Sequence, residues 1–273
     1  MRVLFIGDIF GKPGREIAKR AIPAIVEQRE IDFVIANVEN SAAGFGVTGD
    51  IADTILSFGV DVMTSGNHVW DKKEVLDYFP RQPKLLRPAN FPPGVPGRGS
   101  YVGRTRTGEP VGVINLMGRI FMAPLDDPFA AALREIESMR AKTRVIIVDF
   151  HGEATSEKIA MGWHLDGRVT AVFGTHTHVQ TADERILPKG TACLTDVGMT
   201  GPHDSIIGVT VEAALSRFLN GMPAKFEAAS GPGRFNAVIV TADPATGKAM
   251  AIERLNLSAQ QVETLAGTPA PAR

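Results

Sequence analysis

The sequence predicts an α/β fold in which helices cover both faces of a sheet. Short β-branched runs alternate with amphipathic helical patterns from the first residue onward, which is typical of βαβ units. The 273 residues, of which 44% are hydrophobic, are enough to bury one large core. We expect a single domain over residues 1–257. A flexible tail is expected over residues 258–273, because the chain ends in Pro-Ala-Pro-Ala-Arg.

The elements of the first half follow from these local patterns. Strands are expected over residues 2–9, 33–38 and 60–64. Helices are expected over residues 15–29 and 49–58. The first helix has an apolar side, formed by Ile17, Ala21, Ile22, Ile25 and Val26. The stretch 84–110 is rich in Pro, Gly and Arg, which indicates loops and short strands.

The second half continues the alternation. Strands are expected over residues 111–116, 144–150 and 170–174. Helices are expected over residues 128–139, 156–163 and 211–219, the last after a loop-rich region. Residues 235–256 predict a hairpin, because Asp243-Pro-Ala-Thr-Gly247 has the composition of a turn.

Charge and composition exclude several classes of protein. The formal net charge is −1, whereas proteins that bind long nucleic acids or anionic membranes usually carry a clear basic excess. No apolar stretch approaches the roughly 18 residues of a spanning helix, and Asp8 interrupts the first apolar run too early for a signal peptide. The single cysteine, Cys193, excludes thiolate metal sites and internal disulfides. We expect a cytoplasmic protein with no long nucleic acid or membrane partner.

Polar residues directly follow five of the predicted strands. Ligands in such folds gather beyond the carboxyl ends of the strands, so these positions carry the most information about function. The strand ends present Asp8, Glu39-Asn40, Asn67-His68, His151 and His176-Thr177-His178. His176 and His178 are alternate residues leaving a strand, so their imidazoles point to the same side. We expect all of these groups to face one another across one edge.

The residue types favour a pair of metal ions. Carboxylates, carboxamides and imidazoles form a set of nitrogen and oxygen ligands suited to borderline transition metals. Each residue alone has an ordinary structural role, such as a loop cap at Asp8 or a turn at Glu39 and Asn40. Their joint occurrence at five strand ends favours a dinuclear site. With Asp8 and Glu39 ionised, two divalent cations leave a net charge of about +2, which attracts phosphate.

Three other motifs fit the sequence less well. Residues 7–13 are similar to a phosphate-binding P-loop, but the segment is one residue short and has proline where a hydroxyl residue binds Mg²⁺. His151-Gly-Glu153 is similar to part of a deaminase signature, which also needs two cysteines. A metal-dependent amidohydrolase stays open as an alternative, although its paired histidines belong to an early strand and here the pair comes late.

The order of these residues resembles the calcineurin-like metallophosphoesterase superfamily. That pattern has Gly-Asp, an acidic residue, Gly-Asn-His, a single His and a late Gly-x-His-x-His. The corresponding residues here are Gly7-Asp8, Glu39, Gly66-Asn67-His68, His151 and Gly174-Thr175-His176-Thr177-His178. The superfamily usually has Asp-x-His at the first strand, whereas this chain has Asp8-Ile9-Phe10 and lacks that imidazole.

This departure resembles a bacterial branch, the YmdB-like phosphodiesterases. In that branch the Glu bridges both metals and the adjacent Asn replaces the missing His. Similar segments also occur at residues 37–46, 151–158 and 195–202. The resemblance implies a four-layered α/β/β/α sandwich. It also implies hydrolysis of small phosphodiesters, including 2′,3′-cyclic or 3′,5′-cyclic nucleotides.

The resemblance assigns a role to each candidate residue. The metal ligands are Asp8, Glu39, Asn40 and His178 for one ion and Glu39, Asn67, His151 and His176 for the other. The cofactors are two divalent transition-metal ions, and Fe, Mn and Zn all suit such ligands. His68 is the expected catalytic residue, which donates a proton to the leaving group while a metal-bridged hydroxide attacks phosphorus.

Two further functions stay open at this point. A phosphomonoesterase or nucleotidase would use the same ligands. A regulatory scaffold protein could keep the metal site with weak turnover and act through a partner surface. The sequence does not distinguish these alternatives, and it is compatible with a homo-oligomer.

Overall fold

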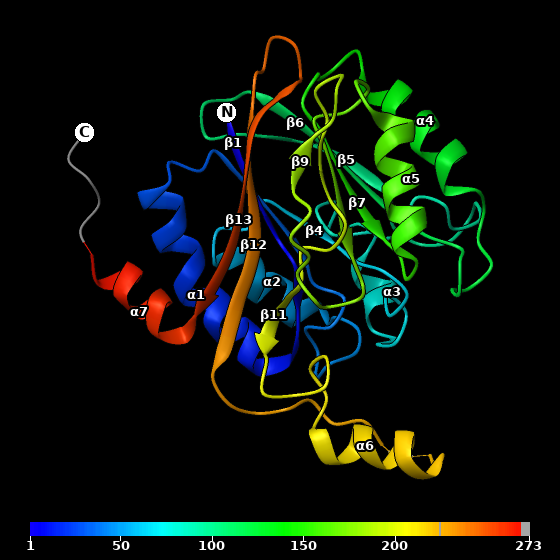
Figure 1. Cartoon of the computed structure of the whole chain (residues 1–273). Coiled ribbons are helices and arrows are strands. Elements are labelled where there is room, and N and C mark those ends of the chain that lie inside the picture. Colours follow the sequence, from blue (N-terminus) through cyan, green and yellow to red (C-terminus); the bar gives the residue numbers. More distant parts are fainter. Residues whose placement is uncertain (224, 269–273) are drawn as a thin grey trace.

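The computed structural model describes residues 1–223 and 225–268 and contains two β-sheets (Figure 1). The first sheet consists of β1 (Arg2–Ile6), β2 (Asp8–Ile9), β3 (Phe33–Asn37), β4 (Val62–Thr64), β11 (Met199–Pro202), β12 (Gly233–Ala242) and β13 (Ala249–Ser258). Its order is β2-β11-β12-β1-β3-β4, and β13 pairs with β12. Since β1, β3 and β4 are parallel, their carboxyl ends lie at one edge.

The second sheet has a parallel centre as well. Its strands are β5 (Ser100–Arg104), β6 (Pro110–Met117), β7 (Ile146–His151), β8 (Ala171–Thr175), β9 (Arg185–Ile186) and β10 (Ala192–Leu194). Their order is β5-β6-β7-β8-β10-β9, and β6, β7 and β8 are parallel. The chain thus has a mixed α/β structure with two sheets.

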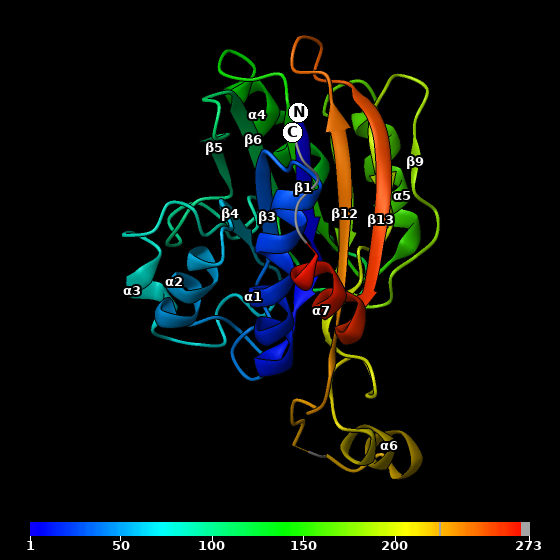
Figure 2. The ribbon, with the colours of Figure 1, turned by 90° about the vertical axis from the view of Figure 1, so that its left-hand side faces the viewer.

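Helices lie on both sides of the paired sheets. They are α1 (Gly11–Gln28), α2 (Gly49–Ser57), α3 (Val75–Tyr78), α4 (Pro128–Met139), α5 (Thr155–Leu165), α6 (Val211–Asn220) and α7 (Ala259–Gly267). In Figure 1, α1 and α7 lie on one side of the sheets and α4 and α5 on the other. Helix α6 projects away from the rest of the chain, as Figure 2 also shows. No helix in the described part of the chain is long and apolar enough to cross a membrane.

The sheets pack face to face because successive side chains of a strand point to opposite faces. In β1, Val3 and Phe5 join the core between the sheets, where the Phe5 ring lies 5.4 Å from that of Phe173. Leu4 and Ile6 belong to the cluster formed with α1 and α2. A third apolar cluster joins α4 and α5 to the outer face of the second sheet.

Most expected elements are present, with three local differences. The strand expected over residues 2–9 breaks at Gly7, because Gly7 passes so close to Gly198 that a Cβ would lie 1.9 Å from its carbonyl oxygen. Helix α1 begins at Gly11 rather than at Arg15, and only Phe10 separates it from the end of β2. The loop-rich region after residue 178 contains the short strands β9, β10 and β11. The hairpin of β12 and β13 is confirmed, and Gly247 N donates to Asp243 O at its turn (2.7 Å).

Within the tail expected from residue 258, the structure places helix α7 over residues 259–267. Ser258 and Gln261 make a reciprocal capping box, a start signal that the proline-rich end of the sequence obscured. Val262 is fully buried in the cluster that contains α1. Residues 269–273 lie outside the described part of the chain.

A buried ion pair stabilises the segment that follows β8. Lys158 Nζ of α5 donates to Asp196 Oδ2 at 2.7 Å, and the two side chains are only 3% and 1% exposed. Asp196 also accepts hydrogen bonds from the backbone N–H of Thr177 (3.0 Å) and from its hydroxyl (2.6 Å). Because Thr177 lies between His176 and His178, the ion pair holds the segment that carries both imidazoles.

Truncation of Val262 tests whether α7 belongs to the core. We expect Val262→Ala to lower the free energy of unfolding by about 2 kcal/mol, because it removes buried apolar groups and leaves a cavity. Denaturant unfolding measures this difference. Gln260→Ala alters an exposed side chain of the same helix and should change the stability by less than about 0.5 kcal/mol. Equal stability of Val262→Ala and the unaltered chain would contradict the packing of α7.

Removal of the Lys158 charge tests the buried ion pair. Lys158→Met should destabilise the chain by about 3–5 kcal/mol, because the Asp196 carboxylate would stay buried without its partner. A second substitution, Asp196→Asn, should recover part of this loss by removing the unpaired charge. The exposed Lys19→Met is the matched control in the same unfolding measurement. A loss below about 1 kcal/mol in Lys158→Met would contradict a structural role for the pair.

Candidate functional site

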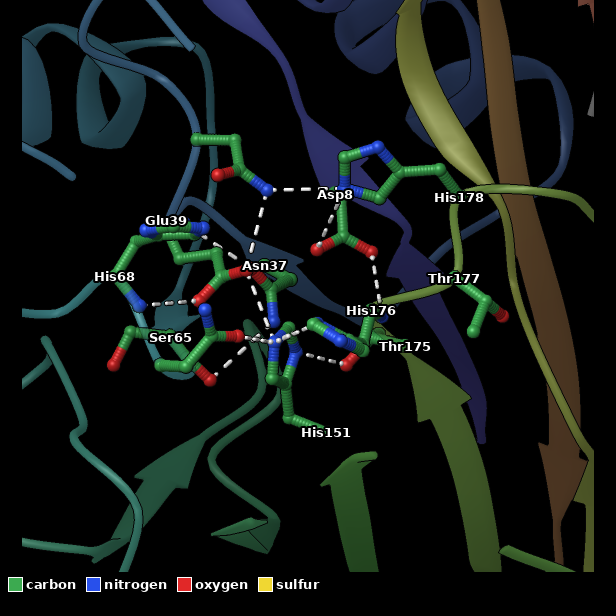
Figure 3. Close-up of polar contacts among 12 residues, drawn as sticks. Asp8, Asn37, Glu39, Ser65, His68, His151, Thr175, His176, Thr177 and His178 are labelled. Atoms are coloured by element: carbon green, nitrogen blue, oxygen red, sulfur yellow. Dashed lines mark hydrogen bonds and ion pairs between the residues drawn. The ribbon is translucent and has the colours of Figure 1, made fainter. Parts of the chain in front are cut away.

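The candidate site lies at the carboxyl ends of parallel strands from both sheets (Figure 3). Asp8 begins β2 beyond the end of β1, His151 is the last residue of β7, and the other groups follow β3, β4 and β8. The structure brings together all eight residues singled out in the sequence, namely Asp8, Glu39, Asn40, Asn67, His68, His151, His176 and His178. Their proximity agrees with the expectation, and their roles as ligands or acid stay a prediction.

The densest part of the site surrounds the His151 imidazole. Its Nε2 atom lies 3.0 Å from Glu39 Oε1, 2.9 Å from Asn67 Oδ1 and 3.0 Å from His176 Nδ1. Ligand atoms of Glu39, His151 and His176 lie within 4.8 Å of one another, so this group could hold a metal ion. Three atoms with lone pairs thus converge on one nitrogen.

A second part of the site contains Asp8, Asn40 and His178. Asp8 is fully buried, and its Oδ1 atom accepts no hydrogen bond within the described residues. His178 Nε2 lies 3.8 Å from this oxygen and 3.1 Å from Asn40 Nδ2. The Asn40 amide also lies 3.2 Å from Glu39 Oε1, so Glu39 sits between the two parts of the site.

Hydrogen bonds on the outer side of the imidazoles orient their inner nitrogens. His178 Nδ1 lies 2.8 Å from the carbonyl oxygen of Ile207, which only accepts, so this nitrogen carries the hydrogen and Nε2 is free to bind. His151 Nδ1 lies 2.8 Å from the Thr175 hydroxyl, which itself donates to Asp149 Oδ1. The Nε2 atom of each imidazole therefore points into the site, the orientation that metal-ligating histidines adopt.

Charges inside the site shift several pKa values strongly. Burial alone would lower the pKa of His151, but the nearby carboxylates, first Glu39, raise it to about 9. Burial would raise the pKa of Glu39, and the charge of His151 outweighs this and holds it well below its usual range. Burial and the His151 charge lower the pKa of His176 to about 3. A proton on His151 Nε2 therefore occupies the position that a cation among these ligands would take.

The donor set can be tested for its fit to divalent cations. A buried carboxylate oxygen without a hydrogen bond, as in Asp8, is unfavourable unless a cation or water binds it. Glu39, Asn67 and His176 each direct a lone pair toward His151 Nε2. A single proton on that nitrogen can satisfy only one of these lone pairs. Asn40 presents its amide nitrogen inward, so ligation by this residue requires the amide to turn over. With that rotation the residues fit two cations.

His68 lies at the more open side of the site. Its Nδ1 atom is 2.8 Å from Asp71 Oδ2, its side chain is 29% exposed, and its backbone N–H donates to Glu39 Oε2 (3.2 Å). Because Asp71 accepts the hydrogen of Nδ1, the Nε2 atom is the one that can exchange a proton with a ligand. The Phe45 ring packs edge-on against the imidazole, with centroids 5.0 Å apart.

Glycine at position 66 is required by the close approach of the chain to the site. A Cβ on Gly66 would lie 2.3 Å from His151 Nε2 and 2.4 Å from Glu39 Oε2. Any side chain would therefore enter the space between these two groups. This explains why the segment that carries Asn67 and His68 begins with glycine.

Sequence reasoning missed the polar residues behind the site. Asp149 is fully buried and accepts hydrogen bonds from Asn37 Nδ2 (3.0 Å) and from the hydroxyls of Thr64 and Thr175. Burial raises the pKa of Asp149 to about 7. A signal was present, because Asp149 interrupts an apolar strand. At the rim, Glu153 Oε2 lies 3.0 Å from His176 Nε2 and was also not anticipated.

Known proteins are similar to this chain over most of its length. The chain is 50% identical over 256 residues to the 2′,3′-cyclic-nucleotide 2′-phosphodiesterase of Bacillus subtilis strain 168, an alignment that covers 93% of this chain and 96% of that protein. The crystal structure of a hypothetical protein from Thermus thermophilus has a TM-score of 0.89 and 45% identity, covering 94% of this chain and 99% of the other. That of a novel phosphatase from Mycoplasma pneumoniae has a TM-score of 0.88 and 35% identity, covering 94% and 93%.

The names of these relatives support a phosphoric ester hydrolase. They agree with the resemblance that the strand-end residues suggested. Residues 4–255, most of the chain, match the model of the family described as YmdB-like protein. The chain therefore belongs to the YmdB-like protein family.

Proposed function

We propose that this chain is a metal-dependent phosphodiesterase that hydrolyses small phosphodiesters, with 2′,3′-cyclic nucleotides as the first candidates. The observation that carries the proposal is the buried convergence of Glu39, Asn67 and His176 on His151 Nε2, next to the unsatisfied Asp8 Oδ1. The substrate follows from the relative named 2′,3′-cyclic-nucleotide 2′-phosphodiesterase. The layered arrangement of helices and sheets supports the α/β/β/α sandwich of metallophosphoesterases.

Two groups of residues would hold the two cations. Asp8, Asn40 and His178 would hold one, and Asn67, His151 and His176 the other. Glu39 lies between the groups, with Oε1 near both Asn40 and His151, and would contact both ions. When bound, such cations lower the pKa of a coordinated water from about 15.7 toward about 7 and neutralise phosphate oxygens.

The residues of the chain then orient the substrate and move a proton. Because Asp71 holds the His68 Nδ1 hydrogen, a second proton on His68 Nε2 can pass to the departing ribose oxygen. An alkoxide leaving group gains most from this proton. Phe45 restricts the rotation of the His68 ring by packing against it.

A phosphomonoesterase is the second candidate, because the Mycoplasma pneumoniae relative is named a phosphatase. Rates with bis-nitrophenyl phosphate and mono-nitrophenyl phosphate on a sample of known metal content separate the two. Faster hydrolysis of the diester, followed by turnover of 2′,3′-cyclic nucleotides, is the expected result. Faster hydrolysis of the monoester, with no turnover of either cyclic isomer, would overturn the diesterase assignment.

Substitution of His68 tests the proton donor. His68→Ala should keep its metal content but lose about 10²–10⁴-fold in kcat with a cyclic nucleotide. The loss should be much smaller with a nitrophenyl ester, whose leaving group needs no proton. Steady-state kinetics on both substrates measure this. Equal losses would remove His68 from this role.

Substitution of Glu39 tests the shared ligand. Glu39→Gln keeps the shape of the side chain but removes its charge, so we expect the bound metal to fall from two ions per chain to one or none, with loss of turnover. Elemental analysis of the purified protein gives the count. Glu153→Gln, which changes a rim carboxylate beside His176, is the control and should keep both ions. Full occupancy in Glu39→Gln would contradict the assignment.

A further inference from the structure

A second polar recess lies at the amino ends of the strands of the second sheet, away from the candidate metal site. It has a volume of about 320 Å³. Its cations are Arg140, Arg144, Arg168, Lys189 and Lys248. They come from the end of α4, the segment before β7, the loop after α5, the segment before β10 and the turn before β13. Segments that are distant in the sequence thus place positively charged side chains around one recess.

Few carboxylates compensate these charges. Within residues 1–223 and 225–268, no acidic side chain forms an ion pair with Arg168, Lys189 or Lys248. Arg140 has one partner, Glu137 at 3.8 Å, which is 83% exposed and contributes little. The recess therefore carries several cations that an anion could neutralise.

The two nearby aspartates are engaged elsewhere. Asp166 accepts hydrogen bonds from the backbone N–H groups of Lys189 (3.1 Å) and Thr191 (3.4 Å). Asp243 accepts from the backbone N–H of Ala245 at 3.0 Å and from the Thr246 hydroxyl at 2.6 Å. Both carboxylates thus stabilise turns that shape the recess.

Helix dipoles explain only part of the cluster. Helices α4 and α5 both end at the recess, and their carbonyl ends favour cations such as Arg140 and Arg168. Lys189 and Lys248 come from turns that precede strands, where no helix end accounts for them. A role in binding an anion accounts for all the cations together.

The recess is held in shape by its turns. Gly167 and Gly190 have φ angles of +79° and +101°, which favour glycine, and a Cβ on either would press against the stems of Lys189 (2.8 Å) and Lys248 (3.0 Å). Arg144 Nη1 donates to Ala245 O at 2.6 Å, which ties the β12–β13 turn to the segment before β7. The stems of both lysines therefore lie against glycine backbone, while their side chains are exposed to solvent.

We infer that this recess binds a chain of phosphate groups, either inorganic oligophosphate or the phosphates of a nucleotide. Several cations in a small volume match closely spaced negative charges, and arginine donors suit phosphate oxygens. Among the described residues, no aromatic side chain lines the recess, so recognition rests on the phosphates and not on a base. Strand β7 runs from Ile146 at the recess to His151 at the metal site, about 17 Å away. The inference is thus independent of the proposed hydrolysis.

Calorimetric titration of the full chain with tripolyphosphate, with ATP and with adenosine tests this inference. We expect saturable binding of the first two and none of adenosine. Tighter binding of ATP than of tripolyphosphate would identify a nucleotide as the source of the phosphates, and equal binding an oligophosphate. The triple variant Arg168→Ala, Lys189→Ala, Lys248→Ala should bind about tenfold or more weakly.

Two control variants show whether the phosphates bind in the recess. A matched triple variant of exposed cations elsewhere, Lys19→Ala, Lys73→Ala, Arg106→Ala, should change the affinity by less than about twofold. Glu39→Gln should keep the affinity, because it alters only the metal site. Absence of saturable binding, equal losses in both triple variants, or loss in Glu39→Gln would overturn the inference. A chain without phosphodiesterase activity that still binds tripolyphosphate here would leave it intact.

Discussion

The buried contact between Glu39 and His151 is the constraint on which the rest of the site depends. Both side chains are almost completely removed from water, and their closest atoms are 3.0 Å apart. A buried carboxylate or imidazole is unfavourable unless it is paired, hydrogen-bonded or bound to a cation. The neighbouring residues meet this requirement in two ways. On the outer side the Thr175 hydroxyl accepts the Nδ1 hydrogen of His151, and on the inner side Asn67 and His176 present lone pairs to its Nε2 atom.

The two sheets make this convergence possible because each contributes the carboxyl ends of parallel strands. Glu39 comes from the first sheet and His151 from the second, so neither sheet alone holds the site. The segment after β8 is held under strain, with φ angles of +97° at His176 and +66° at His178. The Lys158–Asp196 ion pair and the Ile207 carbonyl keep this segment in place.

Opposite ends of the second sheet carry opposite chemistry. The carboxyl ends of its strands carry imidazoles that fit cations together with carboxylates from the first sheet, and its amino ends carry arginines and lysines that fit anions. The near-zero net charge of the chain conceals this separation. The net charge of the whole chain governs its attraction to long polyanions. Binding in a recess of about 320 Å³ depends instead on the few charges that line it.

The sequence by itself determined the alternation of elements, the hairpin turn at 243–247 and the residues at the strand ends, because periodicity and turn chemistry are local. Only the tertiary structure decided the start of α1, the helix α7 and the buried position of Asp149. These depend on contacts between distant segments, such as the hydrogen bond between Asn37 and Asp149, 112 residues apart. A local pattern identifies which side chains leave a strand, whereas their partners are selected by packing that joins remote parts of the chain.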